Sequence, residues 1–154
     1  MNFERLNVEK LSKDQEMPYD LLLLADETID GINTYIFDSY VYIVKEDDLI
    51  IAAFCLSEFN RDTIELENIA VSEDLQGKGV GTFIISYIKR AYKSQFKTLI
   101  VGTADCALKQ INFYEKNGFV KYDIRKSFFI EKYDKPIIEN GVQLKDMIMF
   151  KLKL

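Results

Sequence analysis

The segment from Gln76 to Thr82, QGKGVGT, constrains the fold more than any other part of the chain. Its glycines, Gly77, Gly79 and Gly81, occupy every second position. The segment lies between an apolar strand-like run and a helix-like run. Glycine loses more conformational entropy on ordering than any other residue, so this spacing indicates a loop whose backbone lies close to a ligand. Backbone amides at the start of a helix bind anions without any cationic side chain. The segment therefore predicts an anion-binding loop, and phosphate is the usual occupant.

Apolar periodicity on both sides of the loop predicts strands and helices in alternation. Strands are predicted at Phe3–Val8, Tyr40–Val44, Leu49–Leu56, Thr63–Val71, Thr98–Val101 and Met147–Leu154. Helices are predicted at Pro18–Ala25, from Val80 to Ala91, and from Ala107 to an end at Asn117 and Gly118. A chain of 154 residues fits one domain, so we expect a single α/β domain, residues 1–154, with a mixed sheet and flanking helices.

The fourth predicted strand contains a break in its apolar alternation. Ile64 and Leu66 share one face, whereas Ile69 and Val71 have the opposite parity. One extra residue, at Glu67 or the position after it, returns both pairs to the core, and such an insertion is a β-bulge. The sequence therefore predicts a bulged strand directly before the glycine loop.

Composition excludes several classes of function. The formal net charge is −5 and no basic tract is present, which argues against nucleic acid and anionic membrane surfaces as partners. The absence of histidine excludes Ser-His-Asp and Cys-His mechanisms and ordinary zinc sites, so we expect no metal. Cys55 and Cys106 are expected to be reduced thiols. No apolar run approaches the roughly 20 residues of a membrane span, and acids occupy the N-terminal stretch, so we expect a cytoplasmic protein.

Two familiar phosphate-binding loops do not fit the glycine spacing. A Walker loop needs GxxxxGK followed by Ser or Thr, whereas Lys78 lies between glycines and is followed by Gly79. A dinucleotide fingerprint needs GxGxxG and an acid about 20 residues later, whereas this loop reads GxGxG. The spacing therefore argues against nucleoside triphosphates and dinucleotides.

The stretch ENIAVSEDLQGKGVGT resembles the acetyl-CoA motif of the GNAT family of N-acetyltransferases, in which a bulged strand leads into a Q/RxxGxG/A loop. Gln76, Gly79 and Gly81 fill the Q/R, G and G/A places of that loop. Further along, GTADCALKQINFYEKNGF resembles the second motif of the family. Segments near both ends, PYDLLLLAD and PIIENGVQLKDMI, resemble an uncharacterised bacterial subgroup, so the resemblance covers most of the chain.

The resemblance implies a GNAT fold, a mostly antiparallel mixed sheet splayed at a β-bulge, with acetyl-CoA as the cofactor. It implies that the backbone of Ile69, Ala70 and Val71 meets the pantetheine arm and that the Gln76 side chain shapes the loop. The amides implied to surround the pyrophosphate are those of Gly77, Lys78, Gly79, Val80, Gly81 and Thr82. Ala104 and Asp105 replace a glycine and an asparagine that are common in the subgroup, and Asp105 is expected to cap the following helix.

The resemblance also implies direct acyl transfer from a thioester to a primary amine. An alkylammonium titrates near about 10.4, so a base must accept its proton. Glu65 matches the catalytic glutamate of histone-acetylating relatives, and Glu67 lies two residues further, so both are candidate bases. Tyr114 is the candidate that returns a proton to the leaving thiolate, and a backbone amide of the bulge is expected to meet the oxyanion.

The resemblance places the acceptor pocket between the first helices and the loop that joins the last strands. Its expected lining is Asp26, Glu27, Asp30, Tyr35, Glu131, Tyr133 and Glu139. An acidic and aromatic lining favours a cationic amine such as a polyamine, an amino sugar or an aminoglycoside. A solvated charged surface is the alternative interpretation of the same residues.

The predicted function is transfer of an acetyl group from acetyl-CoA to a small-molecule amine. A non-catalytic acyl-CoA-binding or regulatory module and a protein N-acetyltransferase are the alternatives. The acceptor, the use of other acyl groups and the choice between Glu65 and Glu67 stay open. A monomer and a homodimer are both compatible with the sequence.

Overall fold

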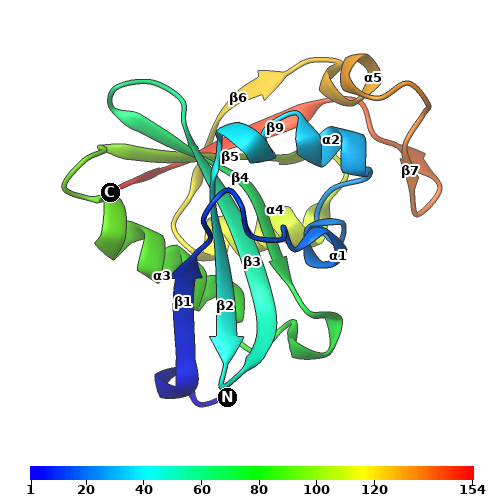
Figure 1. Ribbon diagram of the computed structural model, residues 1–154. Coiled ribbons are helices and arrows are strands. Elements are labelled where there is room, and N and C mark those ends of the chain that lie inside the picture. Colours follow the sequence, from blue (N-terminus) through cyan, green and yellow to red (C-terminus); the bar gives the residue numbers. More distant parts are fainter.

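The computed structural model describes residues 1–154 and contains one large mixed sheet (Figure 1). Its strand order is β1-β2-β3-β4-β5-β9-β6, and every neighbouring pair is antiparallel except β4 and β5. The strands of this sheet are β1 (Leu6–Lys10), β2 (Tyr40–Glu46), β3 (Leu49–Glu58), β4 (Thr63–Val71), β5 (Thr98–Ala104), β6 (Val120–Arg125) and β9 (Met147–Lys153). A separate hairpin consists of β7 (Ile138–Glu139) and β8 (Val142–Gln143). The predicted α/β fold with a mixed, mostly antiparallel sheet is confirmed.

Helices cover both faces of the sheet. They are α1 (Tyr19–Leu22), α2 (Ile29–Asn33), α3 (Val80–Tyr92), α4 (Leu108–Lys116) and α5 (Phe128–Lys132). The main core packs α3 and α4 against one face, with Ile84, Ile88 and Tyr114 buried among strand residues. A second core packs Leu22 of α1 and Ile32 of α2 against the other face. None of the helices combines the length and the apolar character that crossing a lipid bilayer requires.

The predicted β-bulge lies in β4. Leu66 pairs with Leu56 of β3, but Asn68 pairs with Cys55, which leaves Glu67 as the inserted residue. A bulge bends a strand and increases its twist. Ile69 and Val71, beyond the bulge, pack against the same core as Ile64 and Leu66, as their parity predicted.

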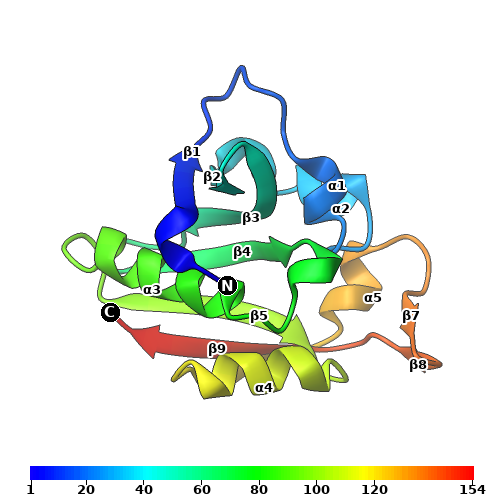
Figure 2. The ribbon, with the colours of Figure 1, turned by 90° about the horizontal axis from the view of Figure 1, so that it is seen from below.

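Strands β4 and β5 separate directly after this point. Their parallel pairing runs from Thr63 opposite Thr98 to Leu66 opposite Val101 and then stops. Each strand continues beyond the last pair, and Figure 2 shows their ends diverging toward α5. The separation leaves backbone edges of both strands unpaired with each other, so a wedge-shaped opening forms between them.

Two boundary predictions at the N-terminal end are wrong. Instead of a strand from Phe3, residues Phe3–Arg5 form a 3₁₀ turn, because the Asn2 side chain accepts a hydrogen bond from the Glu4 amide (3.0 Å). The helix predicted at Pro18–Ala25 is limited to α1, and Pro18 is its cap rather than its first helical residue.

Two helices and three strands were not predicted. Helices α2 and α5 have five residues each, too few to show a helical period. Strand β6 has alternating Val120, Tyr122 and Ile124, but these side chains are exposed at the sheet edge. The β7–β8 hairpin joins strands of only two residues through a turn at Asn140 and Gly141, both of which have positive φ.

Candidate active site

A single cavity follows the opening between β4 and β5 and extends past both of its ends. Its volume is about 580 Å³, which is within the usual range of small-molecule sites. One end is lined by Gln76, Gly77 and Gly81 of the glycine loop, and the other end by acidic and aromatic side chains near α1 and α5. The unpaired parts of β4 and β5 lie between them.

The glycine loop presents free backbone amides at the start of α3. The Phe83 amide donates to the Gly79 carbonyl (3.0 Å), whereas the amides from Gly77 to Thr82 have no acceptor within the chain. Gly77 and Gly79 have φ values of 75° and 92°, which only glycine adopts readily. Free amides and a helix N-terminus together form an anion-binding site.

The side chain of Gln76 closes this loop onto the end of β4. Its Nε2 donates to the Val71 carbonyl (3.0 Å), and Lys109 Nζ of α4 lies 3.5 Å from its Oε1. Gly77, Val80 and Gly81 line the cavity, as do Ile69, Ala70 and Val71. The structure does not place Lys78, Gly79 or Thr82 among the residues that line the cavity. None of the three contributes a side chain to its wall.

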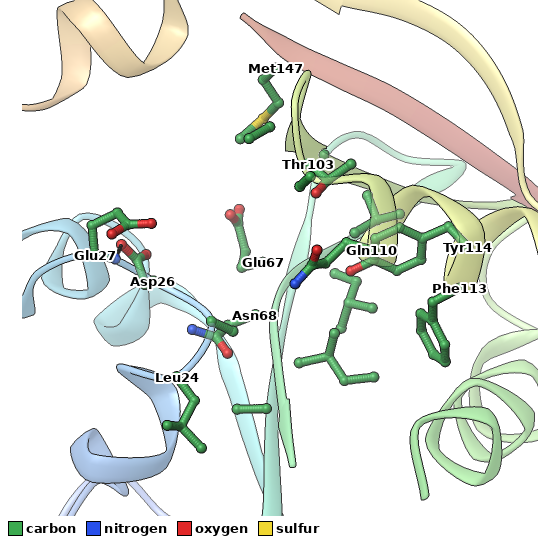
Figure 3. Close-up of a pocket in the computed structure, with 18 of the residues that line it drawn as sticks. Leu24, Asp26, Glu27, Glu67, Asn68, Thr103, Gln110, Phe113, Tyr114 and Met147 are labelled. Atoms are coloured by element: carbon green, nitrogen blue, oxygen red, sulfur yellow. Dashed lines mark hydrogen bonds between the residues drawn. The ribbon is translucent and has the colours of Figure 1, made fainter. Parts of the chain in front are cut away.

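Tyr114 of α4 places its ring in the main core and lines the cavity. The ring packs edge-on against Phe113 and Phe119, with centroids 5.3 and 5.4 Å away. No hydrogen bond occupies its hydroxyl, and burial raises the pKa of this phenol above its ordinary value. The hydroxyl therefore stays protonated at neutral pH and is free to donate to a ligand (Figure 3).

Glu65 is buried in the cavity wall and paired with a residue that the sequence analysis did not identify. Arg125 Nη1 of β6 lies 3.4 Å from Glu65 Oε2. Burial, followed by repulsion from Glu67, raises the pKa of Glu65, and the Arg125 charge opposes that rise. The positive charge of Arg125 therefore balances the negative charge of the buried Glu65 carboxylate.

Glu67, the inserted residue of the bulge, has a different environment. Its Oε1 accepts a hydrogen bond from Ser57 Oγ of β3 (2.8 Å), and no cation lies within salt-bridge distance. In Figure 3 its carboxylate points into the cavity, with Asp26 and Glu27 on one side and Tyr114 on the other. The bulge thus brings both candidate bases to one cavity and gives them different partners.

The far end of the cavity is built around the carboxylate of Asp26. Tyr35 donates its hydroxyl to Asp26 Oδ2 (2.9 Å), and Tyr133 donates to Asp26 Oδ1 (2.7 Å). Asn68 Nδ2 in turn donates to the Tyr35 hydroxyl (3.0 Å), while its buried Oδ1 has no partner. Five residues of the predicted acceptor lining are found at this end: Asp26, Glu27, Tyr35, Tyr133 and Glu139. Asp30 and Glu131 do not line the cavity.

The carboxyl groups of Glu27 and Glu139 interact at the same end of the cavity. Burial is the largest cause that raises the pKa of Glu27, from an ordinary value near 4.5 to about 7. A hydrogen bond with Glu139 and repulsion from Glu139 and Asp26 add to the rise.

No group of three or more acidic, cysteine or histidine side chains in the chain has an arrangement suited to a metal ion.

One predicted role is wrong, and several lining residues were missed. Asp105 does not cap α4, because the N-cap is Ala107 and no side chain accepts a bond there. Arg125 and Lys132 were missed because the elements that carry them, β6 and α5, were not predicted. The alternation of Val120, Tyr122 and Ile124 was the signal that would have located β6 and its last residue, Arg125.

Comparison with known proteins decides the family. The model of the acetyltransferase (GNAT) domain matches residues 37–121, which is more than half of the chain. The chain belongs to the GNAT acetyltransferase family. The resemblance noted in the glycine loop and in the motif around Tyr114 is thus confirmed for this GNAT protein.

Full-length relatives agree with this assignment. The uncharacterized N-acetyltransferase YvbK of Bacillus subtilis is 35% identical over 155 residues, with 100% of both chains covered. A GNAT family acetyltransferase from Elizabethkingia anophelis, solved with acetyl-CoA bound, is 34% identical with a TM-score of 0.92, covering 98% of this chain and 99% of that one. An IAA acetyltransferase from Bacillus cereus is 35% identical with a TM-score of 0.87, covering 97% and 99%.

The raised pKa of Glu27 predicts a pH dependence of stability. The folded state holds a proton on Glu27 that the unfolded state releases near pH 4.5, so this contribution is complete below pH 4.5 and is lost as pH rises through about 7. Between pH 5 and pH 8, the free energy of unfolding of Glu27→Gln should therefore decrease less than that of the wild type. Urea unfolding at each pH measures this quantity. Glu16→Gln, an exposed control, should follow the wild type. An equal loss in Glu27→Gln and the wild type would contradict the prediction.

Proposed function

We propose that this protein transfers an acetyl group from acetyl-CoA to a primary amine of a small cationic acceptor. The observation that carries the proposal is the separation of β4 from β5 beside six amides, Gly77 to Thr82, without an acceptor. An anion fits the amides, and an extended chain with amide groups fits the unpaired strand edges. Acetyl-CoA, whose pyrophosphate is followed by a pantetheine arm, has these two parts in this order.

Acetyl-CoA supplies a thioester, an acyl group already activated for attack by an amine. The residues of the chain would bind and orient it: the loop amides at the pyrophosphate, and the backbone of Ile69, Ala70 and Val71 along the pantetheine. Gln76 keeps the two parts of this site together through its bond to Val71. The Elizabethkingia anophelis relative, solved with acetyl-CoA bound, supports this fit, since it shares the fold at 34% identity.

We assign the base to Glu67 rather than Glu65. Glu65 is held in an ion pair with Arg125 (3.4 Å), so uptake of a proton by Glu65 would break this pair and leave the guanidinium without its partner. Glu67 has only the Ser57 hydroxyl, which fixes one oxygen and leaves the other open to the cavity. A proton from the acceptor ammonium would pass to this carboxylate, directly or through one water.

Tyr114 is the proposed proton donor to the leaving sulfur. Burial keeps its hydroxyl protonated at neutral pH, and the hydroxyl has no competing partner inside the protein. Its ring is fixed by the surrounding phenylalanines, so donation requires no reorganisation of the core.

The charge of the cavity favours a cationic acceptor. Five carboxyl groups line it, Asp26, Glu27, Glu65, Glu67 and Glu139, against three cationic side chains, Lys109, Arg125 and Lys132. Lys109 lies beside Gln76 at the opposite end. An excess of negative charge at a partly enclosed acceptor end attracts ammonium groups.

The proposed activity is tested with a panel of primary amines and acetyl-CoA. Thiol release should increase with at least one cationic amine, and calorimetry should detect acetyl-CoA binding without any amine. Binding without amine-dependent release would indicate a non-catalytic acyl-CoA-binding module. Absence of acetyl-CoA binding would remove the proposal altogether.

Glu67→Gln should lower kcat by about 10²-fold, because general base catalysis typically contributes about 10² to 10⁴-fold. The substitution keeps the size of the side chain and its bond from Ser57, so the affinity for acetyl-CoA should change little. Initial rates and calorimetry measure the two effects. Glu115→Gln on the exposed face of α4 is the control and should keep full activity. Unchanged kcat in Glu67→Gln would move the role of base to Glu65.

Tyr114→Phe should lower kcat while the dissociation constant of acetyl-CoA stays within about twofold, because only a proton donor is removed from a packed ring. Stopped-flow or steady-state thiol release gives the rate. The matched control is Tyr122→Phe, which removes a phenol from the exposed face of β6. If both variants turned over like the wild type, Tyr114 would have only a packing role.

A further inference from the structure

Three aromatic rings at the acceptor end surround an ammonium group that belongs to the chain itself. Lys132 Nζ lies 5.3 Å from the centroid of the Tyr35 ring, 5.3 Å from Phe128 and 5.5 Å from Tyr133. All three distances are within the roughly 6 Å at which a ring face attracts a cation. We call the set Tyr35, Phe128 and Tyr133 the cation cage. All four residues line the cavity that holds Glu67 and Tyr114.

Contacts that do not involve Lys132 fix the rings of the cation cage. Asp26 accepts hydrogen bonds from the hydroxyls of Tyr35 and Tyr133, which come from opposite ends of the chain. Phe129 stacks on Tyr133 with an interplanar angle of 6° and meets Phe128 edge-on at 84°. The close approach of Asp26 and Tyr133 to helix α2 also depends on Gly31. A Cβ atom at this position would lie 2.8 Å from Asp26 Oδ1 and 2.9 Å from Tyr133 Cε1. The cation cage is therefore formed whether or not an ammonium occupies it.

The three rings are the direct contacts of the Lys132 ammonium in the cation cage. Its ammonium donates no hydrogen bond and has no carboxylate within 4.0 Å, although acidic residues line the same cavity. A lysine carries a long flexible stem with several rotatable bonds, and its charge is strongly hydrated. The side chain can leave toward solvent without breaking a hydrogen bond inside the protein.

From this geometry we propose that the cation cage is a second ammonium site of the acceptor pocket and that Lys132 is its internal occupant, which the acceptor displaces. The acceptor class is then a diamine: one amino group reaches Glu67, and the remote ammonium enters the cation cage. The proposal rests on the proposed acetyltransferase function for the role of the first amine. Binding to the cation cage itself requires no reaction.

The surroundings of the cation cage favour a ligand cation over any anion. The Asp26 carboxylate accepts hydrogen bonds from the hydroxyls of two of the rings, and Glu27 and Glu139 line the same end of the cavity. The nearby cation Arg125 is engaged by Glu65 and is not free to bind an anionic group. A monoamine of the same length would leave Lys132 in place and gain nothing from the rings. Discrimination between diamine and monoamine is therefore the signature of the site.

The test is an NMR titration of the full chain saturated with CoA, using 1,4-diaminobutane and 1-aminobutane as probes. Lys132→Ala empties the cation cage and should tighten the diamine dissociation constant by about fivefold, which is about 1 kcal/mol at 1.4 kcal/mol per tenfold change. The monoamine constant should change much less. Lys135→Ala removes the same charge from an exposed position three residues away and should leave both constants unchanged.

A double variant separates the rings from the charge. In Lys132→Ala/Phe128→Leu one ring of the cation cage is absent, so the gain in diamine affinity should disappear. Persistence of the gain would mean that charge removal alone caused it, which overturns the proposal. Two results for Lys132→Ala alone also overturn the proposal. One is an unchanged diamine affinity, and the other is an equal gain in affinity for the diamine and the monoamine. Thiol release plays no part in the titration, so failure of the cation cage and failure of the proposed function are separate results.

Discussion

The insertion of Glu67 into β4 is the constraint on which the site depends. Up to Leu66 the strand pairs with both β3 and β5, and beyond the bulge it keeps only β3. The same insertion returns Ile69 and Val71 to the main core, so the bulged strand remains anchored while its other edge is free. A backbone edge without a partner inside a protein is costly unless a ligand or water satisfies it. The backbone groups at the opening therefore need a ligand or water as partners, and the glycine loop lies at one end of the opening.

A second constraint joins distant segments at the acceptor end. Asp26 receives hydrogen bonds from Tyr35 and Tyr133, and the latter contact spans 107 positions of the chain. These bonds hold α5 against the region of α1 and α2, which fixes one wall of the acceptor end. The same wall carries Lys132 and the rings around it. Carboxylates, phenols and a lysine thus line one end of the cavity that also holds Glu65 and Glu67.

Local patterns in the sequence were sufficient for the cofactor end and insufficient for the acceptor end. The apolar alternation predicted β4 with its observed bounds, and the slip in parity predicted the bulge, because both depend on neighbouring residues. The Arg125 pairing with Glu65 and the cage around Lys132 depend on tertiary contacts between segments far apart in the chain. Helix α5 has five residues, too few to show a helical period, and the apolar alternation of β6 was missed because its side chains are exposed at the sheet edge.

Hydrogen exchange of the backbone amides, with and without acetyl-CoA, tests most directly whether the break in β4–β5 pairing is the cofactor site. Acetyl-CoA should slow exchange at the amides from Gly77 to Thr82 and in the β4 residues Ile69 to Val71. Exchange at Ile64 to Leu66, where the strands are already paired, should stay unchanged. Protection confined to other surfaces, or no new protection in the glycine loop, would contradict this account.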